Sequence, residues 1–77
     1  MNNTITVTYF GFSDETGNFS CSVHKGDLKE GRGVFLEDFT AGKLHKKAQY
    51  EVKKMAGNFP VKVREMKKNV TVIDIIR

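Results

Sequence analysis

Six residues in the middle of the chain have the chemistry to bind an anionic partner. They lie within residues 43–54, which read KLHKKAQYEVKK, and they are Lys43, Lys46, Lys47, Tyr50, Lys53 and Lys54. Ammonium groups attract phosphate backbones and acidic protein surfaces, and an aromatic ring among them supplies contact area that can be buried. These six residues are our candidate binding site. The alternative is that they form only the solvated side of a helix, because lysine is a good helix former.

The spacing of these residues predicts that only some of them share one side of a helix. At about 100° per residue, four fall within a stripe roughly 60° wide beside the apolar stripe: Lys43, Lys47, Tyr50 and Lys54. Lys46 and Lys53 lie further round, almost opposite the core. Glu51 can reach Lys47 or Lys54 and neutralise it in part. We expect the four-residue stripe to be the centre of the binding surface.

Four later basic residues could enlarge this surface: Lys62, Arg64, Lys67 and Lys68. Lys62 and Arg64 share one face of a predicted strand, opposite Val61 and Val63, because side chains alternate along a strand. If that face points away from the helix, the basic surface is divided in two. The sequence leaves both arrangements open.

No combination of residues predicts catalysis or metal binding. Cys21 and His24 have the chemistry of a nucleophile and a base, but residues three apart on a strand point to opposite faces. We expect Cys21 to be a small core residue. His24 and His45 are far apart, and the segment from Gly31 to Gly33 lacks the third glycine and the lysine-serine pair of a phosphate-binding loop. The expectation is a non-enzymatic protein without metal or cofactor.

Charge is unevenly distributed along the 77 residues, whose formal net charge is +4. Residues 1–38 carry three basic and six acidic side chains, a net of −3, and residues 39–77 carry ten and three, a net of +7. The basic half suits an acidic partner, whereas the negative half would repel phosphate. One cysteine, a polar start and no apolar run of about 18 residues predict one cytoplasmic domain without signal peptide or membrane contact.

Apolar periodicity predicts the elements that position the candidate site. Residues 4–24 alternate as a β-hairpin, in which Phe10 and Phe12 break the pattern. Either a bulge near Gly11 turns these rings inward or they cover the other face of the sheet. Residues 25–38 have no period and three glycines. We expect a loop there, least ordered over residues 25–37, with a short extended piece at residues 34–36.

A helix is expected over residues 40–56, capped by Asp38 or Thr40 and ended by the segment from Gly57 to Pro60. Its apolar stripe should be buried, and this stripe comprises Ala41, Leu44, Ala48, Val52 and Met55. Two strands should follow Pro60, with a turn at residues 67–69. Asp74 lies in the last one, so its carboxylate must be paired, at an edge or at an interface.

The predicted order is therefore ββαββ, which belongs to the α+β fold class. We expect a small antiparallel or mixed sheet of three to four strands, with one α-helix packed on one face. The threonine and serine rows of the hairpin suit exposure of the opposite face to water.

Two functions are compatible with these features. The first is a small protein-interaction module, an inhibitor or adaptor, that binds a larger protein with an acidic surface through the lysine-rich helix. The second is a nucleic-acid-binding protein that contacts the phosphate backbone of DNA or RNA through the same helix. The protein-interaction module is favoured, because the chain has only three arginines and no recognisable RNA-binding aromatic signature or helix-turn-helix.

In size, composition and element order, the chain resembles the small accessory proteins that bacteriophages encode to inhibit host factors. The resemblance implies a compact α+β domain that binds a host protein in the host cytoplasm. It rests on no motif and assigns no role to an individual residue. The sequence leaves the oligomeric state open.

Overall fold

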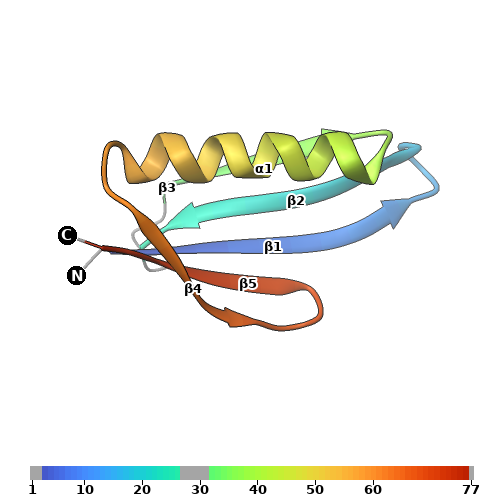
Figure 1. The fold of residues 1–77 in the computed structure, drawn as a ribbon. Helices are drawn as coiled ribbons and strands as arrows, with labels where there is room; N and C mark the ends of the chain where they lie inside the picture. The colour runs from blue at the N-terminus through green and yellow to red at the C-terminus, as the bar shows by residue number, and fades with distance from the viewer. Residues whose placement is uncertain (1–2, 27–31, 77) are drawn as a thin grey trace.

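The computed structural model describes residues 3–26 and 32–76, which form one helix and a five-stranded sheet (Figure 1). In chain order the elements are β1 (Thr4–Ser13), β2 (Asn18–Lys25), β3 (Arg32–Asp38), α1 (Ala41–Ala56), β4 (Val61–Met66) and β5 (Val70–Ile75). The strands lie side by side in the order β3-β2-β1-β5-β4, and all neighbours are antiparallel. The α+β class with one helix is confirmed. The predicted ββαββ order and the count of three to four strands are wrong.

The additional strand is β3, which lies in the segment predicted as a loop. It pairs with β2 along its whole length, so that Phe35 lies opposite Ser22 and Gly33 opposite His24. The predicted disorder is therefore wrong for residues 32–37, whereas residues 27–31 lie outside the described residues. Gly33 has a packing reason: a Cβ there would lie 2.5 Å from Cδ2 of His24, so the glycine makes room for the ring.

The β1–β2 hairpin contains the bulge that the sequence allowed. Tyr9 pairs with Cys21 and Gly11 with Ser20, so Phe10 is the extra residue, and the bulge ends at Gly11 with φ of +87°. The Phe10 ring packs 6.1 Å from that of Phe35 on the face opposite the helix. Phe10 lies on the open face by ordinary alternation after Tyr9, and the bulge instead brings Phe12 to the side of Phe19, whose ring centre lies 5.1 Å away.

Helix α1 begins and ends with the residues proposed for those roles. The hydroxyl of Thr40 accepts a hydrogen bond from Lys43 N at 3.3 Å, and Asp38 Oδ1 accepts one from Thr40 N at 3.2 Å. At the other end Gly57 has φ of +66°, and its N–H donates to the carbonyl of Lys53 at 3.0 Å. Glycine is required there because other residues rarely adopt this backbone conformation.

The core lies between α1 and the part of the sheet beneath it. Leu44, Ala48 and Val52 are buried as predicted, and Met55 is partly buried. Ala41 is exposed, which corrects the predicted stripe, and Ala56 is buried at its other end. The sheet contributes apolar residues from β1, β2 and β5: Ile5, Val7, Cys21, Val23, Ile73 and Ile75.

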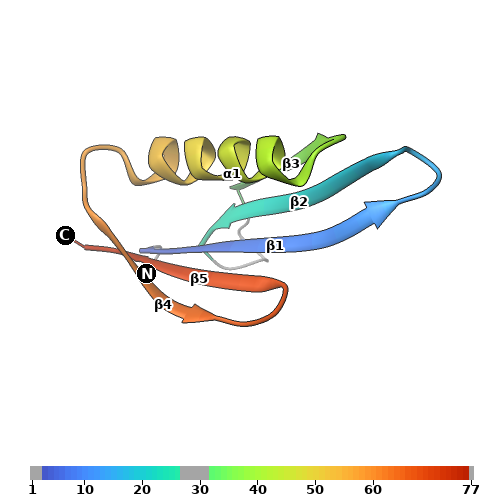
Figure 2. The same ribbon diagram turned by 45° about the vertical axis from the view of Figure 1, so that its right-hand side comes forward.

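Coverage of the sheet by the helix is unequal. Helix α1 packs mainly against β2 and β3, and the β4–β5 hairpin extends away from it (Figures 1 and 2). The helix therefore does not cover β4, and the apolar side chains of Val61, Val63 and Met66 remain exposed next to it. Within residues 3–26 and 32–76, no helix has the length and apolar character needed to cross a membrane.

Candidate binding surfaces

The lysine-rich stripe of α1 is joined by an aromatic residue that precedes the helix. The ammonium group of Lys43 lies 5.0 Å from the centre of the Phe39 ring, and that of Lys54 lies 6.0 Å from the centre of the Tyr50 ring. Both rings are 65% exposed. A cation this close to an aromatic face is attracted by the ring quadrupole. We call this surface the basic helix face, and it comprises Phe39, Lys43, Lys47, Tyr50 and Lys54.

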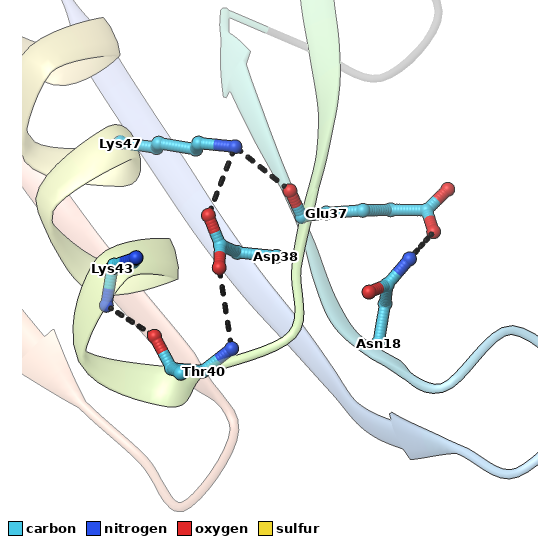
Figure 3. Close-up of polar contacts among 6 residues, drawn as sticks. All are labelled: Asn18, Glu37, Asp38, Thr40, Lys43 and Lys47. Carbon is cyan, nitrogen blue, oxygen red and sulfur yellow. Dashed lines mark hydrogen bonds and ion pairs between the residues drawn. The ribbon is translucent and has the colours of Figure 1, made fainter.

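Lys47 has a different environment from the other lysines of this face. Its ammonium group lies 3.1 Å from Asp38 Oδ2 and donates a hydrogen bond to the carbonyl of Glu37 at 3.0 Å (Figure 3). The hydrogen bond from Lys47, together with that from the Thr40 N–H, holds the pKa of Asp38 below its ordinary value. The predicted partner, Glu51, makes no ion pair with any residue that the structure describes. Lys47 therefore fastens α1 to the end of β3.

The other two candidate lysines lie elsewhere on the helix, although only Lys46 lies on the outer side where the spacing predicted both. Lys53 lies on the edge of α1 that faces the β4–β5 hairpin, where it lines a groove described below. Lys46 is exposed on the outer side of the helix. The structure thus brings Lys43, Lys47, Tyr50 and Lys54 together and separates Lys46 and Lys53 from them.

Lys62 and Arg64 do not extend the basic helix face. Lys62 lies opposite Asp74 in the β4–β5 pairing, on the sheet face turned away from α1. Arg64 donates from Nε to Asp74 Oδ2 at 2.8 Å, and its Nη2 lies 2.6 Å from Oδ1. This two-pronged contact accounts for the carboxylate in the last strand. The basic surface is therefore divided, which was one of the two arrangements left open.

Phe39 is the member of the basic helix face that sequence reasoning missed. It stands outside the helix, before the Thr40 cap, and so escaped a search based on helical periodicity. The available signal was its spacing of four residues from Lys43, which the first helical turn brings to the same side.

A second surface, an apolar groove, lies between α1 and the β4–β5 hairpin. It has a volume of about 880 Å³, and the connection at residues 57–60 forms part of its lining. Its floor includes Val7 and Ile73, and its outer wall includes Val63 and Met66. Val63 is 48% exposed and Met66 75% exposed. Apolar side chains exposed together in this way mark binding sites more often than isolated ones.

The polar groups of the groove are few. Near one end the hydroxyl of Tyr9 lies 3.0 Å from Nδ1 of His45, so these two side chains bind each other. Among the described lining residues, Lys53 is the only lysine, and none is an aspartate or a glutamate. Lys53 has no ion-pair partner in the described part of the chain. The groove therefore combines apolar walls with a positive rim.

Cys21 and His24, the two residues with the chemistry of a nucleophile and a base, lie on opposite faces of the sheet. Cys21 is 0% exposed, and burial raises the pKa of its thiol, which disfavours the reactive thiolate. His24 stands on the opposite sheet face, where its ring lies against Gly33. Residues 3–26 and 32–76 contain no group of three or more histidine, cysteine, aspartate or glutamate residues arranged to hold a metal ion.

Comparison of the chain with known proteins gives no match to a protein-family model, to a curated protein sequence or to a solved structure.

Proposed function

We propose that this chain is a non-enzymatic protein-interaction module, of the inhibitor or adaptor kind, whose basic helix face binds an acidic protein surface. The observation that supports this most is the pairing of two exposed aromatic rings with lysines on one side of α1. Phe39 stands beside Lys43 and Tyr50 beside Lys54. Aromatic residues surrounded by charge are typical of the energetic centres of protein interfaces.

Each member of this surface has a separate contribution. Tyr50 and Phe39 offer rings that a partner can bury, and burial of an aromatic ring slows dissociation. Lys43 and Lys54 attract an acidic surface from a distance and so raise the association rate. Lys47, held by Asp38, keeps the helix in place beneath these side chains rather than contacting the partner directly.

Nucleic acid is a less suitable partner for this face. Asp38 ends the strand beside it, so a phosphate backbone laid across the lysines would approach its carboxylate. Asp38 also neutralises Lys47, which removes one phosphate contact. An acidic protein surface can be shaped to avoid the Asp38 carboxylate, whereas a regular phosphate backbone cannot.

Affinity capture from a cell extract, with and without nuclease, tests the proposal. Three baits are compared: the parent, the Lys43→Glu/Lys54→Glu variant, and a Lys67→Glu/Lys68→Glu variant of identical charge altered on the β4–β5 turn. Lys47 is left intact because a glutamate there would face Asp38 and weaken the helix start.

We expect the parent and the turn variant to retain one stoichiometric protein after nuclease treatment, and the helix variant to lose it. Loss of every partner on nuclease treatment would assign the surface to nucleic acid instead. Equal losses in both variants would mean that net charge, rather than the basic helix face, determines binding.

A further inference from the structure

We infer that the apolar groove is a docking site for an amphipathic helix with an acidic flank, supplied by a partner protein and laid alongside α1 over β5 and β4. This inference concerns a surface separate from the basic helix face and does not depend on the function proposed for that face. It rests on the width of the uncovered sheet, on the apolar residues exposed there and on the charge at the rim.

The width of the sheet explains why a helix fits. Five strands spaced about 4.8 Å apart span roughly 19 Å between the outer strand axes, whereas one helix with its side chains covers about 10 Å. Helix α1 lies over β2 and β3, at one side of this surface (Figure 2). The sheet therefore extends roughly 9 Å beyond the helix. On its outermost strand, β4, Val61, Val63 and Met66 are exposed, whereas Ile73 and Ile75 of β5 are buried. In a two-layer fold, such a face is normally covered by a second helix.

The exposed side chains supply the contacts that such a helix needs. Val63 and Met66 are exposed on one wall, whereas Val52 on the α1 side and Ile73 on the floor are each only 8% exposed, so a bound helix would contact chiefly the β4 wall. This is the arrangement that receives the i, i+3, i+4, i+7 apolar stripe of a helix bound in a groove. Addition of a strand to β4 is less favourable, because the pairing of this edge strand is interrupted between Val63 and Glu65.

Charge selects the kind of helix. Lys53 lines the groove, and no aspartate or glutamate lies among its described lining residues. A partner helix with acidic residues beside its apolar stripe would pair with this lysine. A second copy of this chain would bring another basic half, since residues 39–77 carry a net charge of +7, and the two copies would repel each other.

Titration with designed peptides, followed by amide NMR of the labelled full chain, tests the inference. The probe is a peptide of about four helical turns with leucine at i, i+3, i+4 and i+7 and glutamate beside them. A peptide of the same composition with its leucines spread around the helix is the first control, and a peptide with lysine in place of glutamate is the second. The variants are Val63→Ser/Met66→Ser and Lys53→Glu, with Phe35→Ser on the opposite sheet face as the matched loss of exposed apolar area.

We expect the acidic amphipathic peptide to shift the amides of Val63, Met66 and Ile73. Its affinity should fall about tenfold when its leucines are spread or when Val63 and Met66 are changed, and it should be unaltered by Phe35→Ser. Lys53→Glu should weaken this peptide about threefold or more and strengthen the lysine peptide.

Four results would overturn the inference. Shifts confined to Lys43 and Tyr50 would place the peptide on the basic helix face. Equal binding of the leucine-spread peptide would show that charge alone attracts it. Concentration-dependent dimerisation through Val63 and Met66, or saturation of the groove by a small apolar dye without peptide binding, would assign the groove to another occupant.

Discussion

The ammonium group of Lys47 lies 3.1 Å from the carboxylate of Asp38, so an ion pair joins the second turn of α1 to the last residue of β3. Asp38 also accepts a hydrogen bond from the N–H of Thr40, the residue that caps the helix. The carboxylate thus links strand, cap and helix at a single point (Figure 3).

This link predicts how stability depends on acid. The pKa of Asp38 is lower in the folded state than its ordinary value, chiefly because Lys47 donates to it. The resulting stabilisation is complete above the ordinary carboxyl pKa and is lost as pH falls through the lowered value. Lys47→Met should raise the pKa of Asp38 and move acid unfolding to higher pH. Lys46→Met, an exposed lysine on the same helix, is the control. Carboxyl NMR titration and melting temperature against pH measure both effects, and coincident acid profiles would contradict this role.

Leu44→Asp should unfold the protein. Leu44 is 2% exposed beneath α1. An unpaired buried carboxylate costs several kcal/mol, against a total stability of about 5–8 kcal/mol for a small domain. Gln49→Asp, an exposed position one turn further along the helix, is the matched control and should retain helical circular dichroism. A parent-like melting temperature for Leu44→Asp would show that the helix register is wrong.

The thiol of Cys21 should react only when the chain opens. It is 0% exposed in the core, and its pKa is raised by burial, so both access and thiolate formation are suppressed. Labelling with an aromatic disulfide reagent should be complete within the mixing time in denaturant and slow by orders of magnitude in native buffer. Addition of a destabilising change such as Val23→Ala should accelerate the native reaction. Rapid labelling of the native parent would place Cys21 outside the core.

Arg64 and Asp74 should make a modest contribution to stability. Their side chains are 58% and 27% exposed, so solvent screens the contact despite its two-pronged geometry. Asp74→Ala should reduce the free energy of unfolding by about 0.5–1 kcal/mol. A double-mutant cycle with Arg64→Ala, measured by urea unfolding, separates the pair from its surroundings. Additive losses would show that the two residues do not interact in solution.

The sequence predicted the elements whose signals are local. The cap at Thr40, the stop at Gly57 and the alternation on both sides of Gly17 depend on neighbouring residues, and all were correctly placed. Strand β3 was predicted only as a short extended piece at residues 34–36. Its stability comes from pairing with β2, a partner outside its own segment, and Gly33 weakens its intrinsic strand preference.

The same strand explains what could not be predicted about the site. Glu51 was expected to reach Lys47 or Lys54 on its own helix, but the end of β3 brings Asp38 to Lys47 instead. With β3 present, α1 lies over β2 and β3 and leaves Val61 and Val63 beside it. The alternation of Val61 and Val63 with charged residues showed that the two valines share a face of β4. Only the complete sheet shows that the helix does not cover this face.

Binding kinetics with the captured partner test the central claim, that the basic helix face is the docking surface. Lys43→Glu/Lys54→Glu should slow association about tenfold or more while changing dissociation little, because these lysines act at long range. Tyr50→Ala should mainly accelerate dissociation, because its ring is the contact that becomes buried. Association and dissociation rate constants equal to those of the parent in both variants would contradict the claim and leave α1 with a merely solvated face.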